Sequence, residues 1–79
     1  MNILEVYKLN YFFTQSLEQN HPITIIYIAK DRSITQRKII VKKVTKSTLI
    51  AYCLLRRQIR TFSIDHILSA GIQSSSKAV

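Results

Sequence analysis

Residues 49–67 read LIAYCLLRRQIRTFSIDHI, and two apolar segments in this stretch flank a basic turn. Side chains alternate between the two faces of a strand. Leu49, Ala51 and Cys53 therefore share an apolar face of the first segment, and Arg60, Phe62 and Ile64 share one face of the second. Between them, Arg56-Arg57-Gln58 is the expected tip of a hairpin, and Asp65-His66 forms a corner after the second strand. The stretch therefore predicts a β-hairpin that carries arginines, which is typical of a binding surface.

The same period of two runs through the upstream segment. Residues 23–28 alternate and are rich in β-branched side chains, and residues 30–33 form a polar turn before a second strand at 36–41. Val44 is out of phase with Val41, which predicts a bulge near Lys42 and Lys43. A turn at 45–47 leads into the hairpin, and a last strand is expected from residue 68 to 72 or 73, with Gly71 allowing close backbone approach at a corner. Five short antiparallel strands result.

A helix is expected before the first strand. Apolar residues recur at spacings of three and four from residue 2 to residue 20: Val6, Leu9, Phe13 and Leu17. Asn2 and Glu5 resemble a capping box, and His21-Pro22 ends the helix because a residue before proline avoids the α conformation. The helix is either continuous or broken near Asn10.

This helix is apolar over more than half its circumference and must be covered. We expect Phe13 and Leu17 to pack on the strands, and Tyr7 and Tyr11 to contact a partner, because a large exposed apolar patch is unusual on a monomer. A homodimer through the N-terminal helix is the simplest form of that contact.

Residues 49–67 also resemble the most characteristic stretch of the WYL domain, a bacterial ligand-sensing module with a small barrel. The matching positions are Ala51, Tyr52, Cys53, Leu55, Arg56, Arg60, Thr61, Phe62, Ile64, Asp65 and Ile67, with Ile25-x-Tyr27 and Arg37-x-Ile39 upstream. The resemblance covers residues 22–72 and departs from the family pattern at residues 47–49, which read Ser-Thr-Leu, and at Ser63 and His66.

The resemblance implies a five-stranded antiparallel Sm-like (SH3-type) barrel, which we place at residues 22–73. With the N-terminal helical segment (1–21) that the apolar spacing predicts, and a tail (74–79) that we expect to be disordered, the fold class is α+β, mainly β. The resemblance also implies a non-catalytic module that senses a nucleic-acid or nucleotide-like ligand through Arg37, Arg56 and Arg60. His66 and Ser63 stand where family members often have arginine. WYL domains are usually attached to a DNA-binding winged helix, so a regulatory role here would act through a partner, or the module works alone.

Composition and charge limit the remaining possibilities. The chain has 79 residues, one cysteine and no apolar run near the ~18 residues of a membrane span, so we expect one small cytoplasmic domain without a disulfide. Ten of the twelve basic residues fall in residues 30–60, with Asp31 as the one acidic residue there. Such a segment attracts anions, although a solvated basic surface is the simpler reading.

A catalytic or metal site is not expected. Cys53 lies mid-strand on an apolar face, and Asp65 and His66 are neighbours that point to opposite sides of an extended chain. Asp65 is expected to cap the corner or to pair with an arginine. With two histidines, one cysteine and one glycine, the sequence has neither metal-ligand spacing nor a phosphate loop, so no cofactor is predicted.

The candidate binding residues combine arginine forks with aromatic side chains, which together suit phosphates and unpaired bases. They are Arg37, Arg56, Arg57, Arg60, Tyr27, Tyr52 and His66. The predicted ligand is single-stranded nucleic acid or a small nucleotide-like anion. The alternative is a structural or interaction protein that dimerises or docks on a larger transcriptional regulator; an Sm-type RNA-binding ring is a third, weaker reading.

Overall fold

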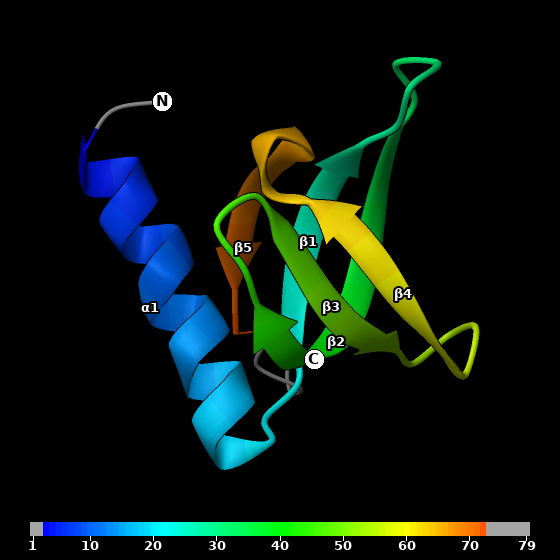
Figure 1. Cartoon of the computed structure of the whole chain (residues 1–79). Helices are drawn as coiled ribbons and strands as arrows, with labels where there is room; N and C mark the ends of the chain where they lie inside the picture. The colour runs from blue at the N-terminus through cyan, green and yellow to red at the C-terminus, as the bar shows by residue number, and fades with distance from the viewer. Residues whose placement is uncertain (1–2, 73–79) are drawn as a thin grey trace, which may run out of the picture.

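The computed structural model describes residues 3–72 and has one helix followed by five strands (Figure 1). Helix α1 spans Ile3–Gln19, and the strands are β1 (Ile23–Ile28), β2 (Ile34–Val44), β3 (Thr48–Cys53), β4 (Gln58–Ser63) and β5 (Ile67–Gly71), with a short 3-10 helix, η1 (Ile64–His66), between the last two. The expected helix and antiparallel strands are confirmed, and α1 runs through Asn10 without a break. The capping box at Asn2 and the tail at 74–79 lie outside the described residues.

The strands form one antiparallel sheet in the order β4-β3-β2-β1-β5. In the part of the chain that the structure describes, no ladder joins β4 to β5, so hydrogen bonding between strands does not close the barrel. Side chains bridge the opening instead: the Tyr27 hydroxyl on β1 accepts a 3.4 Å hydrogen bond from the Ser63 N–H on β4. The η1 turn connects the two outer strands.

Strand β2 contains the expected bulge. Its pairing with β3 shifts between Val41 and Lys43, so Lys42 is the extra residue. The role expected for Gly71 is wrong, because a Cβ atom built on it would meet nothing within 4 Å. Gly71 pairs with Thr24 at the end of β5, and the strand starts at Ile67, one residue earlier than expected.

The core lies between α1 and one face of the sheet. Its buried side chains are Leu9, Phe13, Ile23, Ile25, Ile39, Val41, Leu49, Ala51, Phe62 and Ile67. Leu17, which was expected in this core, is 42% exposed. On a helix, position i+7 returns to within about 20° of position i, whereas i+8 lies about 80° away. Ser16 therefore follows Leu9 and Phe13 on the buried face, and Leu17 is rotated out.

Ser16 is fully buried and joins the helix to β2. The β1–β2 ladder begins at the Ile23–Ile39 pair, so Val41 directs its N–H toward a position that β1 does not reach. The Ser16 hydroxyl accepts that N–H at 2.8 Å. The hydroxyl therefore satisfies a buried donor for which the sheet provides no acceptor.

The helix ends in a turn that repeats a common C-terminal motif. Asn20 has a φ of 55°, and the His21 N–H donates to the Ser16 carbonyl at 3.2 Å. A left-handed residue combined with this hydrogen bond is the Schellman motif. Its left-handed position is usually occupied by glycine and sometimes by asparagine, as here. Pro22 then starts the extended chain, in agreement with the expected helix end.

Candidate functional site

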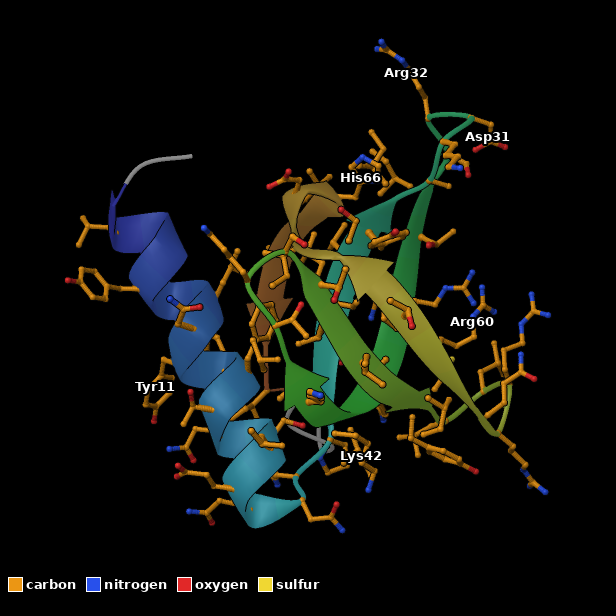
Figure 2. All side chains as sticks on the ribbon, viewed as in Figure 1. Tyr11, Asp31, Arg32, Lys42, Arg60 and His66 are labelled. Carbon is orange, nitrogen blue, oxygen red and sulfur yellow. The ribbon has the colours of Figure 1, made fainter. Side chains whose placement is uncertain are left out.

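Arg37 and Arg60 lie on the core face of the sheet, beyond the area that α1 covers. Arg37 on β2 pairs with buried Ile25, and Arg60 on β4 pairs with buried Ala51, so both arginines point to the side of the sheet that carries the core. Both are half-buried. Figure 2 shows Arg60 on the side of the molecule away from α1. The alternation of the strands thus continues from an apolar core into a basic surface.

Tyr27 connects this surface to the corner after β4. Its ring packs edge-on against Phe62 at 5.2 Å and against His66 at 6.0 Å between ring centroids. Tyr27, Arg37 and Arg60 are all on the core face, and His66 reaches Tyr27 from η1. Phe62 is only 4% exposed and belongs to the core, as expected.

Two further polar residues share the face and were not singled out from the sequence. Thr35 pairs with Tyr27, and Gln58 pairs with buried Cys53. Within residues 3–72, the buried Thr35 Oγ1 has no hydrogen-bond partner. The alternation Thr35-x-Arg37 could have identified Thr35, because residues two apart in a strand share a face. We define the arginine face as Arg37, Arg60, Tyr27, Thr35, Gln58 and His66.

The structure separates the other candidates from this face. Arg56 and Arg57 are exposed in the turn between β3 and β4, where Arg57 has a φ of 56°. Tyr52 is on the opposite face of the sheet, between Ile40 on β2 and Ile59 on β4. Tyr52 therefore does not share a surface with Arg37 and Arg60.

The basic groups of the site are not neutralised by the protein. Among the described residues, neither Arg37 nor Arg60 lies within salt-bridge distance of a carboxylate. Within the same residues the Asp65 carboxylate accepts no hydrogen bond and pairs with no arginine, so the expected cap or ion pair at Asp65 is not formed. Asp31, in the turn between β1 and β2, accepts hydrogen bonds from the Ser33 hydroxyl (2.7 Å) and the Ser33 N–H (3.0 Å). These bonds hold the pKa of Asp31 below its usual value. The arginines thus remain available to an external anion.

A reactive thiol, a metal site and a membrane helix each have requirements that the described residues do not meet. The Cys53 thiol is buried in the sheet, with 1% exposure. Within residues 3–72, no three His, Cys, Asp or Glu side chains come together as metal ligands do. No helix described here has the length and apolar character needed to cross a membrane.

Fold and site together define a small helix-capped β-domain with a basic face. The model of the WYL domain family matches residues 13–72, which is most of the chain, and the chain belongs to that family. The match begins inside α1, nine residues before the segment that the sequence motifs alone suggested.

Among solved structures, the proteasome accessory factor B/C (PafBC) of Arthrobacter aurescens is similar over the whole chain, with a TM-score of 0.67 and 18% sequence identity. The chain spans 14% of the length of that protein, so the similarity concerns the fold of one part of it. No curated protein matches the sequence.

Proposed function

We propose that this chain is a non-catalytic, ligand-sensing module of WYL type that binds single-stranded nucleic acid or a nucleotide-like anion through the arginine face. The observation that carries the proposal is the position of Arg37 and Arg60, which are half-buried on the face of the sheet that also carries Tyr27 and have no carboxylate partner in the described residues. Guanidinium groups bind phosphate oxygens in a planar fork, and an aromatic ring nearby can stack on a base. A cytoplasmic location fits the single cysteine.

A salt-varied titration of a short fluorescent oligonucleotide tests this proposal. For single strands, log K falls with log salt by about 0.7 per phosphate contact, so removing two contacts should reduce the slope by about 1.4. We expect this reduction for Arg37→Ala combined with Arg60→Ala. Lys43→Ala combined with Lys46→Ala is the matched control, because both lysines are exposed near the opposite end of β2.

An equal reduction of the salt slope in the two double variants would refute a defined site. It would indicate that the oligonucleotide is attracted by the total charge alone. Titration with a nucleoside triphosphate in place of the oligonucleotide separates the two ligand sources. If only the triphosphate binds, the site recognises a small anion.

A second candidate function, interaction with another protein chain, is favoured by an apolar hollow between α1 and β5. Tyr7 is 69% exposed and Tyr11 is 57% exposed, and both line the hollow together with Leu4, Phe12 and Ala70. This exposure supports the proposal that the two tyrosines contact a second copy of the chain or a larger regulator.

The solution mass over a range of protein concentrations tests self-association. We expect a dimer that Tyr11→Lys disrupts and that Asn10→Lys preserves, because Asn10 is exposed and lies about 100° around α1 from Tyr11. A monomer at every concentration would remove the homodimer and leave a larger regulator as the partner to be sought.

A further inference from the structure

Strand β4 has an unpaired edge, because it is an outer strand and pairs only with β3. The Ile64 N–H donates to the Ser47 carbonyl at 3.0 Å, which continues the β3–β4 ladder. Residues in step with Ile64, such as Arg60, therefore direct their N–H groups toward β3. Ile59 and Thr61, which are out of step, direct their N–H and C=O groups away from the sheet.

The edge is open only over part of its length. At its end, the Ser63 N–H donates to the Tyr27 hydroxyl and is thereby occupied. We call residues 58–61 the open edge. Natural sheets usually protect such edges with proline, a bulge, an inward-pointing charge or a covering helix. The open edge has no proline and no bulge, and in Figure 1 the described helices lie elsewhere. Its one protecting feature is Arg60, an inward-pointing charge that disfavours a basic strand and attracts an acidic one.

The two faces beside the open edge differ in chemistry. On the core face Arg60 is half-buried. Arg56 and Arg57 are exposed at the end of the strand, in the turn that leads into β4. On the opposite face Ile59 is 55% exposed and continues an apolar row through Tyr52. The side chains of an added strand would point alternately to the two faces of the sheet. One set would therefore lie near the arginines, and the other set would lie on the apolar surface.

We propose that the open edge of β4 binds an extended acidic peptide segment, which joins the sheet as a sixth strand. Its backbone pairs with Ile59 and Thr61, its carboxylates face the arginines, and its intervening apolar side chains pack on Ile59. Backbone pairing supplies affinity in such strand addition, and alternate side chains supply specificity. A second copy of the chain fits poorly, because an antiparallel pairing of Ile59 in one copy with Thr61 in the other would put the two Arg60 side chains directly opposite each other.

The probe is a blocked peptide of about six residues, the usual length of a strand, in which glutamate alternates with valine. A peptide with lysine in place of glutamate is its matched control. We expect the acidic peptide to bind and to slow hydrogen exchange of the Ile59 and Thr61 amides in the unmodified protein. Thr61→Pro removes the N–H donor of residue 61 from the open edge, whereas Thr61→Ala keeps it. The proline variant should bind the acidic peptide about tenfold more weakly than the unmodified protein, and the alanine variant should bind it with unchanged affinity.

Equal binding of the acidic and basic peptides would overturn the proposal, as would unchanged exchange of the Ile59 and Thr61 amides on binding. The exchange measurement needs no variant, so it decides the matter even if Thr61→Pro does not fold. Protection of the same two amides without peptide, rising with protein concentration, would show that a second copy occupies the edge and would also overturn the proposal.

Discussion

Replacing Ser16 by alanine should destabilise the domain, although alanine is the better helix former. Ser16 is fully buried, and its hydroxyl accepts the Val41 N–H at 2.8 Å, where β1 offers no acceptor. Leaving a buried donor without a partner costs about 1–3 kcal/mol. The gain in helix propensity returns about 0.5 kcal/mol. The expected net loss is about 0.5–2.5 kcal/mol, or roughly 2–20 °C in Tm for a domain of this size.

Urea unfolding followed by circular dichroism measures this difference directly. Thr14→Ala is the matched control, because Thr14 is exposed on the same helix and its replacement changes helix propensity without removing a buried hydrogen bond. We expect the control to be neutral or slightly stabilised. A Ser16→Ala protein as stable as the control would refute the reasoning, because water or a shifted backbone would then have satisfied Val41 at no cost.

Two smaller perturbations test the turns. The pKa of Asp31 is lowered by its hydrogen bonds to Ser33, so its contribution to stability is fully present above the unfolded value of about 3.9 and disappears as pH falls through the lower folded value. The stability difference between the parent protein and Asp31→Asn, measured by denaturation across acidic pH, should therefore shrink as pH falls through this window. Arg57 has a φ of 56°, so Arg57→Gly should stabilise the domain by up to about 1 kcal/mol. Arg57→Ala should give no such gain in the same unfolding assay.

The predictions for Asp31 and Arg57 can each be contradicted by these measurements. A pH-independent difference for Asp31→Asn would mean that the hydrogen bonds to Ser33 do not persist in solution. A glycine variant no more stable than the alanine variant would mean that Arg57 does not hold the left-handed conformation.

Alternation along the chain was sufficient to predict much of the sheet. The phase change after Val41 identified the bulge, and the apolar positions of residues 49–53 and Phe62 identified their buried face. The same reasoning placed Arg60 on the face of Phe62, which the pairing confirms.

The composition of the site was only partly predictable from the sequence. Tyr52 was selected as a tyrosine that could expose its hydroxyl on the barrel surface, although alternation along residues 49–53 already separates it from Ala51 and Cys53, and the pairing places it on the face opposite Arg60. Leu17 is exposed because the neighbouring Ser16, and not Leu17, faces the sheet. Ser16 takes that position because its hydroxyl accepts the hydrogen bond of the Val41 N–H. Such choices depend on strand register and on where β1 begins, which local periodicity does not fix.

The contribution of α1 to the core determines how short a fragment of this protein can be. A peptide that starts at the first strand would keep every strand but lose Leu9, Phe13 and the hydroxyl that satisfies Val41. Its sheet would have one apolar surface facing water, which is a common origin of aggregation. Fragments intended for crystallisation, spectroscopy or fusion to other domains should therefore retain the whole helix.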